Sequence, residues 1–264
     1  MNLSKENAKV NPNAKIEPIN NIPYILLAAG LIFLCLALLH NHNVSALIGI
    51  ALTFWGAVLL YAGKSEYVNK DVFDNSFLGS NDSLSSFIDR MNYSGIPTYT
   101  SPKTLSTYSD VYIVITKSAS QSLPSDEQLA QKKQFLEDPP SIILPPPGSK
   151  LLGYIQNEME IDLFSTHIEE LGKILETIIV NKLEMSREIN VENKGQIISL
   201  QLKDSIFNTI TSSIKNDEIL RYFGDPLTSL IACIIVLATH RNTRIKSIDI
   251  NNEENSIKID YELL

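Results

Sequence analysis

Two long apolar stretches open the chain, and their spacing predicts a pair of membrane helices. The stretches are Tyr24–His40 and Ser45–Gly63, and a tetrapeptide, residues 41–44, separates them. Neither stretch contains Lys, Arg, Asp or Glu. Each has about the length that a helix needs to cross a hydrocarbon core of ~30 Å. The pattern therefore predicts a transmembrane helical hairpin over residues 23–63, after a polar N-terminus of residues 1–22.

The charges beside these stretches predict the orientation of the hairpin. Lysines flank it on both outer sides, and the connecting tetrapeptide has no Lys or Arg; the flanking residues are Lys5, Lys9, Lys15, Lys64 and Lys70. Positive charges concentrate on the cytoplasmic side of membrane helices. We therefore expect a protein of the cell membrane with both termini, and the whole chain after the second helix, in the cytoplasm.

Small residues share one face of the second predicted helix: Gly49, Thr53, Gly56 and Gly63. Because small residues let helix backbones approach closely in lipid, this transmembrane packing face is expected to contact another helix. Packing of the hairpin on itself is the first interpretation, with Ala28 and Cys35, seven residues apart, as the matching strip on the first helix. A contact between copies of the chain is the alternative.

After a juxtamembrane linker, residues 64–80, the pattern predicts a cytoplasmic domain over residues 81–264. Its first part, residues 81–148, contains a short amphipathic helix that begins at the cap Asn81. Two strands are expected next, over Thr98–Thr100 and Asp110–Thr116. A polar loop follows over Lys117–Pro140, with Ser125 as a helix cap. A third strand over Ser141–Leu144 is ended by three prolines and a glycine.

The second part, residues 149–264, alternates helices with hairpins. Ser149 is expected to cap the first helix, and the rhythm of apolar residues predicts an amphipathic helix over Phe164–Leu183. A hairpin follows over Glu188–Lys203, and then a short helix over Ile206–Ile214. The last elements are a helix that is apolar nearly all round, Pro226–Thr239, and a closing hairpin, Arg244–Leu264. The expected fold is α+β, with antiparallel hairpins packed on helices that cover one face of the sheet.

Composition and charge restrict the partners. The formal net charge is −8 and the pI is about 5.1, which argues against nucleic acid as a partner because nucleic acid rewards a basic surface. The two cysteines, Cys35 and Cys233, fall in a membrane span and in an apolar helix. A disulfide between them is not expected, because a cytoplasmic domain is kept reduced.

A search for reactive groups finds no catalytic motif, no cofactor-binding motif and no metal site. His40 and His42 have no carboxylate or thiolate near them in the sequence, so they form an incomplete metal site. His167 is interpreted as a solvated residue and His240 as a residue that ends the apolar helix. Cys233 is expected to be an unreactive core thiol.

Four short motifs give the chain a resemblance to uncharacterised archaeal membrane proteins that pair two spans with a cytoplasmic C-terminal domain. They are residues 94–99 (Ser-Gly-Ile-Pro-Thr-Tyr), 111–115, 144–148 (Leu-Pro-Pro-Pro-Gly) and 225–233. In layout, residues 171–264 are similar to the vinyl-reductase-type and TRAPP-like domains. The vinyl-reductase-type resemblance implies a regulatory module that binds small molecules, and it assigns a role to no residue of this chain.

Two functions fit these observations, and an enzyme is disfavoured. The first is a membrane-anchored sensing or regulatory module that binds a small apolar ligand or a protein partner. Its ligand would lie in a pocket lined by Leu175, Ile179, Leu230, Cys233, Ile234 and Leu237. The second is a structural or assembly protein that forms a homo-oligomer without a ligand. A cavity favours the first function, and a solid core with an exposed apolar patch favours the second.

Overall fold

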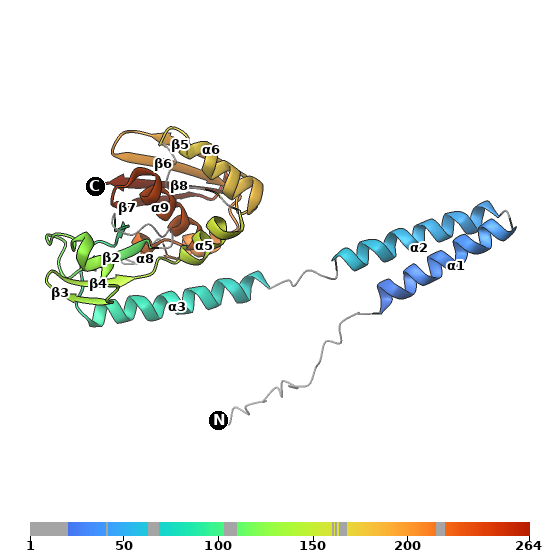
Figure 1. Ribbon diagram of the computed structural model, residues 1–264, viewed down its shortest axis with the longest axis horizontal. Coiled ribbons are helices and arrows are strands. Elements are labelled where there is room, and N and C mark those ends of the chain that lie inside the picture. Colours follow the sequence, from blue (N-terminus) through green and yellow to red (C-terminus); the bar gives the residue numbers. More distant parts are fainter. Residues whose placement is uncertain are drawn as a thin grey trace, which may run out of the picture. The chain divides into compact units, whose positions relative to one another are not determined.

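The protein divides into two compact units along the chain (Figure 1). The computed structural model describes residues 21–40, 42–62, 69–102, 110–159, 161, 163, 168–214 and 220–264. The first unit lies within Met1–Asn69 and contains two helices, α1 (Ile22–His40) and α2 (Asn43–Ala62). The second unit spans Lys70–Leu264 and contains a sheet with helices.

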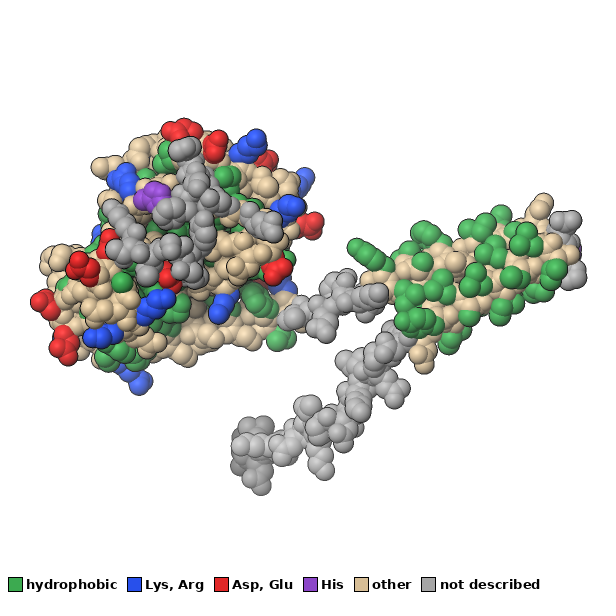
Figure 2. All heavy atoms as spheres, viewed as in Figure 1, with side chains coloured by type: hydrophobic (Ala, Val, Ile, Leu, Met, Phe, Trp, Pro, Cys, Tyr) green, Lys and Arg blue, Asp and Glu red, His purple; other side chains and the backbone are tan. Residues whose placement is uncertain are grey.

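Helices α1 and α2 are compatible with insertion into a membrane. Among the described residues, these two helices are long and apolar enough to cross one, judged by length and composition. Large apolar side chains cover the visible face of the hairpin, whereas charged side chains are scattered over the second unit (Figure 2). Leu38 is 82 % exposed and Leu47 is 73 % exposed, a surface that suits lipid rather than water.

Small residues bring the backbones of α1 and α2 together. A Cβ added to Gly49 would lie 2.8 Å from Cγ of Leu34, and one added to Gly56 would lie 2.8 Å from Cγ of Leu27. Thr53, on the same face of α2, lies against Gly30 of α1 and donates its hydroxyl to the Gly49 carbonyl at 2.8 Å. Thus Gly49, Thr53 and Gly56 lie at the contact within the hairpin. Gly63 lies outside the described residues.

The matching strip expected on α1 was wrong. Ala28 and Cys35 are exposed, and the buried strip, also at intervals of seven, consists of Pro23, Gly30 and Ala37. A helix that is apolar all round has no polar face to identify its packed side, so the seven-residue spacing alone could not distinguish the two strips. The strip that contains Gly30 packs against α2, because Gly30 allows the closest approach of the two backbones.

In the described part of the second unit, eight strands form one antiparallel sheet. In spatial order they are β3 (Phe135–Glu137), β4 (Pro140–Leu144), β2 (Tyr112–Thr116), β1 (Thr98–Thr100), β7 (Thr243–Asn251), β8 (Ser256–Leu263), β6 (Ile197–Lys203) and β5 (Glu188–Asn193). The predicted mixed class of helices and antiparallel hairpins is confirmed. Strand β1 joins the two halves of this sheet by pairing with β7 at Tyr99 and Thr243.

Helix α9 is the core helix of this unit, and α5 and α6 contact it. The described helices of this unit are α3 (Lys70–Arg90), α4 (Asp126–Ala130), α5 (Ser149–Glu158), α6 (Leu171–Leu175), the π-helix η1 (Glu176–Lys182), α7 (Asn208–Ile214), α8 (Leu220–Phe223) and α9 (Pro226–Thr239). Every residue from Leu227 to Ala238 is buried, as the apolar pattern predicted. Helix α9 lies over the middle of the sheet, beside α5 and α8 (Figure 1).

The alternation of residues in β6 and β8 gives that half of the sheet one apolar face and one polar face. Ile259 lies opposite Leu200, and Tyr261 lies opposite Ile198, all four in the main core. The neighbouring positions are polar. Asp260 lies opposite Ser199 and accepts a 2.7 Å hydrogen bond from the Ser199 hydroxyl. This half of the sheet therefore buries the face on which α9 packs.

The other half of the sheet is buried on both faces, which the expectation of one covered face had missed. Ile113 and Ile115 of β2 belong to the main core. Val114, which points to the opposite face, belongs to a second cluster with Ile143 and Leu129. Leu129 lies in α4, so the polar stretch between β2 and β4 supplies a short helix that covers this face. Ser125 caps α4 with a capping box, as predicted.

Two predicted helix starts were wrong. Helix α3 begins at Lys70, within the expected linker, and passes through Asn81, which is buried and caps nothing. Its early turns are helical because Phe77 and Leu78 pack against the core. Helix α5 is capped by Gly148, without a side-chain hydrogen bond, so Ser149 is its first residue and not its cap.

The long amphipathic helix expected over Phe164–Leu183 is shorter and irregular. Its regular part, α6, begins at Leu171 and gives way to the π-helical turns of η1 from Glu176. Phe164 lies outside the described residues. The apolar rhythm correctly placed Leu175 and Ile178 in the core, but it does not specify the hydrogen-bond spacing along the helix.

Candidate ligand-binding cavity

A cavity of about 470 Å³ lies at the C-terminal end of α9. Its lining comes from four separate segments: Ser101 and Pro102 after β1, Asp126 at the start of α4, Val236 to Asn242 at the end of α9, and Leu264 after β8. The lining residues are Ser101, Pro102, Asp126, Val236, Leu237, His240, Arg241, Asn242 and Leu264. The cavity therefore depends on the position of α9 relative to both halves of the sheet.

A buried aspartate fixes the start of α9. Asp225 is the N-cap: one carboxylate oxygen accepts the N–H groups of Leu227 at 2.8 Å and Thr228 at 3.1 Å. The other oxygen accepts the hydroxyls of Thr211 at 2.7 Å and Thr228 at 3.0 Å. Burial raises the pKa of the Asp225 carboxyl, and these hydrogen bonds lower it less than burial raises it. The cap thus ties α9 to α7 through Thr211.

Two buried tyrosines attach the first turns of α9 to the sheet. The Tyr261 hydroxyl of β8 donates to the carbonyl of Thr228 at 2.8 Å. The Tyr99 hydroxyl of β1 donates to the carbonyl of Phe223, just before the cap. Burial raises the pKa of both phenols well above the ordinary value, so both remain neutral donors. Each half of the sheet therefore holds the same end of the helix.

A close backbone contact holds α9 on its other side. The N–H of Gly148 donates to the hydroxyl of Ser229 at 3.1 Å. A Cβ at position 148 would overlap the backbone of Leu230, so the turn after the three prolines requires glycine. The cap, the two tyrosines and this contact together determine where the far end of α9 lies.

The far end of α9 forms the polar rim of the cavity. His240 adopts a left-handed conformation with a φ of 53° and donates its backbone N–H to the Val236 carbonyl at 2.9 Å. The Arg241 guanidinium then reaches the end of β8, where it donates to the carbonyls of Leu263 at 3.1 Å and Leu264 at 3.3 Å. These bonds hold Arg241 at the rim.

The arrangement combines an apolar floor with a charged rim. Val236 and Leu237 lie at the floor and are each 2 % exposed, so most of the exposed apolar surface belongs to Leu264, which is 44 % exposed. Asp126, His240 and Arg241 supply polar groups above it. The volume falls within the range of about 300–1,000 Å³ that is typical of ligand pockets, and five of the nine lining residues are polar. Among the described residues, no group of three or more His, Cys, Asp or Glu could hold a metal ion.

The six residues expected to line a pocket lie together in the core. Five of them are fully buried (Leu175, Ile179, Leu230, Cys233 and Ile234), and Leu237 is 2 % exposed. Leu237 is the member of this set that lines the cavity just described. Burial raises the pKa of the Cys233 thiol, so the sulfur stays protonated and unreactive.

Sequence reasoning missed the rim of the cavity. Asp126 and Arg241 lie 115 positions apart by their numbers, and no local pattern connects them. One signal was available: His240 was expected at the end of the apolar helix, and the residues beside it are the rim. The expected solvated residue His167 lies outside the described residues.

The chain was also compared with known proteins. No family model, no curated protein and no solved structure matches it.

Proposed function

We propose that this protein is a membrane-anchored, non-enzymatic sensing module that binds a small amphipathic molecule in the cavity at the end of α9. The observation that carries the proposal is the cavity itself, with Val236 and Leu237 as an apolar floor and Arg241 fixed at its rim. The fold holds α9 at four points near its start: the Asp225 cap and the contacts with Tyr99, Tyr261 and Gly148.

The ligand class follows from the lining. An apolar body would lie against Leu264 and the exposed ends of Val236 and Leu237, and an anionic or strongly polar head would meet Arg241. A guanidinium has five N–H donors. The bonds from Arg241 to the carbonyls of Leu263 and Leu264 use two of them, which leaves donors for a ligand. The layout of residues 171–264, similar to the vinyl-reductase-type domains, supports a ligand-binding role.

The location of the domain is part of the proposal. Helices α1 and α2 would anchor the chain in the cell membrane, and the lysines before and after the hairpin favour a cytoplasmic position for both termini. A cytoplasmic domain on a membrane anchor can report a ligand to other proteins at the membrane surface.

Native mass spectrometry of the full chain, released from detergent, tests the proposal. We expect the wild type to retain a small molecule of reproducible mass. Leu237→Trp, which fills the floor, and Asn242→Trp, which blocks the rim from a half-buried position, should both lose it. Ile206→Trp is the matched control, because Ile206 is 47 % exposed and does not line the cavity.

The outcomes separate ligand binding from the alternative of an assembly protein. Loss of the molecule from both cavity variants, with thermal midpoints close to that of the control, supports the proposal. A wild-type chain without any bound small molecule overturns it, as does full retention in both cavity variants. A bare oligomer in the same spectrum would then favour assembly as the function.

A further inference from the structure

Strand β5 is an edge of the sheet that contains no proline and no bulge. The sheet ends in β3, with three residues, and β5, with six. Edge strands expose unpaired N–H and C=O groups, and proteins blunt them with proline, bulges or charged side chains. The sequence of β5, Glu-Ile-Asn-Val-Glu-Asn, has no proline, and its register with β6 is continuous from Glu188 to Asn193.

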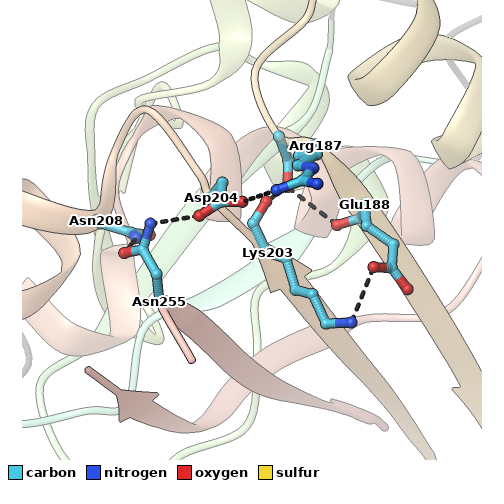
Figure 3. Close-up of polar contacts among 7 residues, drawn as sticks. Arg187, Glu188, Lys203, Asp204, Asn208 and Asn255 are labelled. Atoms are coloured by element: carbon cyan, nitrogen blue, oxygen red, sulfur yellow. Dashed lines mark hydrogen bonds and ion pairs between the residues drawn. The ribbon is translucent and has the colours of Figure 1, made fainter. Parts of the chain in front are cut away.

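Each acidic side chain of β5 has a basic neighbour in the same chain. Glu188 forms an ion pair with Lys203 of β6 at 2.8 Å, and Figure 3 shows the two side chains meeting across neighbouring strands. Glu192 pairs with Lys194 at 2.9 Å. Both ion pairs are solvent-exposed and therefore weak, so their charges still act on a strand that faces the edge. The residues between the two glutamates, Ile189 and Val191, are apolar and half-buried.

The pairing with β6 determines which backbone groups face outward. Lys194 donates its N–H to the carbonyl of Ile197, its direct partner in the hairpin. Hydrogen-bonded pairs alternate along an antiparallel ladder, so even-numbered residues of β5 bond to β6. The N–H and C=O groups of Ile189, Val191 and Asn193 are consequently directed to the free edge.

We propose that β5 binds β5 of a second copy of this chain, antiparallel, about a two-fold axis at Val191. In this register Val191 lies opposite Val191 of the second copy, and Ile189 lies opposite Asn193. Each outward amide then finds a partner. Glu188 lies opposite Lys194 and Asn190 opposite Glu192, so the cross-strand charges are complementary. The two sheets join into one continuous sheet.

Neighbouring registers of the β5 pair would place like charges opposite each other. Centring the pair on Asn190 places Glu188 opposite Glu192 of the second copy, and centring it on Glu192 places that carboxylate opposite itself. Like charges directly opposite each other destabilise a strand pair. Charge therefore selects the register at Val191.

The symmetry of the pair follows from the antiparallel arrangement. Its two-fold axis runs perpendicular to the sheet, so both copies present the same face in the same direction.

Disulfide cross-linking of the full chain in liposomes tests the register. Opposite residues of a non-hydrogen-bonded pair have Cα atoms about 4.5 Å apart, close enough for a disulfide. Asn190→Cys and Glu192→Cys chains, each in a Cys35→Ser background and with different tags, are co-reconstituted and oxidised. We expect a dimer that contains both tags and little dimer from either variant alone. A dimer from one variant alone, or no dimer at all, overturns the proposed pairing.

A backbone variant tests the interface independently. Val191→Pro removes an N–H that is directed outward, so it should abolish dimers and leave the ladder with β6 intact. Val191→Thr keeps the N–H and is the matched control. In detergent, mass photometry should show a dimer for the wild type and Val191→Thr, and a monomer for Val191→Pro. A dimer that persists in a folded Val191→Pro chain would overturn the inference.

Discussion

The hydroxyl of Tyr261, in the last strand, donates a 2.8 Å hydrogen bond to the backbone carbonyl of Thr228, in the first turn of α9. Both residues are buried, and the bond connects the end of the chain to the helix that carries the cavity. The position of α9 is thus specified by polar bonds as well as by apolar packing.

Replacing this hydroxyl should destabilise the domain modestly. Tyr261→Phe removes one buried hydrogen bond, which costs about 1 kcal/mol and lowers the thermal midpoint by roughly 2–4 °C for a domain of this size. Thermal unfolding of the full chain in detergent measures the effect. Tyr154→Phe is the control, because Tyr154 is 52 % exposed and should leave the midpoint unchanged. An equal midpoint for both variants would show that the bond contributes nothing.

Gly148 should be intolerant of a single added methyl group. In Gly148→Ala the new Cβ would overlap the Leu230 backbone, and we expect a loss of about 1–3 kcal/mol in unfolding free energy. Gly153→Ala is a matched substitution within α5, with no atom within 4 Å of the added Cβ. That variant should gain about 0.5–1 kcal/mol, because alanine favours helices. Chemical denaturation of both variants and of the wild type measures these changes in unfolding free energy.

Asp225 predicts a pH dependence of stability. Its folded pKa is raised above the unfolded value of about 3.9, so the native state holds the proton more tightly than the unfolded chain. The unfolding free energy contributed by this group therefore falls as the pH rises through the window from about 3.9 to the raised value. Asp225→Asn cannot titrate and should lack this fall.

The comparison is made by denaturation of both proteins across that pH range. The difference in unfolding free energy between the wild type and Asp225→Asn should move in favour of the amide variant as the pH rises. A difference that is independent of pH would mean that the carboxyl does not titrate in the window. A difference that moves in favour of the wild type would mean that the folded pKa is lowered.

Cysteine labelling tests the proposed topology of the hairpin. In a Cys35→Ser background, His42→Cys should react in intact cells with a maleimide that cannot cross the membrane. Ser4→Cys and Ser86→Cys should react only after the cells are permeabilised. His42 lies in the connection between α1 and α2, and Ser86 is an exposed residue of α3. Labelling of Ser86→Cys in intact cells would mean that the domain lies outside the cell, which contradicts the proposed orientation.

Strong periodicity made parts of this structure predictable. The apolar helix Pro226–Thr239 and the closing hairpin appear where alternation and apolar runs placed them. Helix α3 was misplaced because its first turns are polar in sequence, and the packing of Phe77 against distant residues makes them helical. The cavity was missed because Ser101, Asp126 and Arg241 meet only after the two halves of the sheet are joined.

The junction between those halves has a consequence for how the chain folds. Strands β1 to β4 pair among themselves, as do β5 to β8, and the register joins the two sets at Tyr99 and Thr243. The Arg244 guanidinium crosses the same junction to the hydroxyl of Thr98 at 2.8 Å. The pair β1–β7 closes the longest loop in the sheet, and β6–β8 closes the next longest, so the β1–β7 contact carries the largest entropy cost of loop closure. Formation of that contact should be the slow step that also completes the cavity.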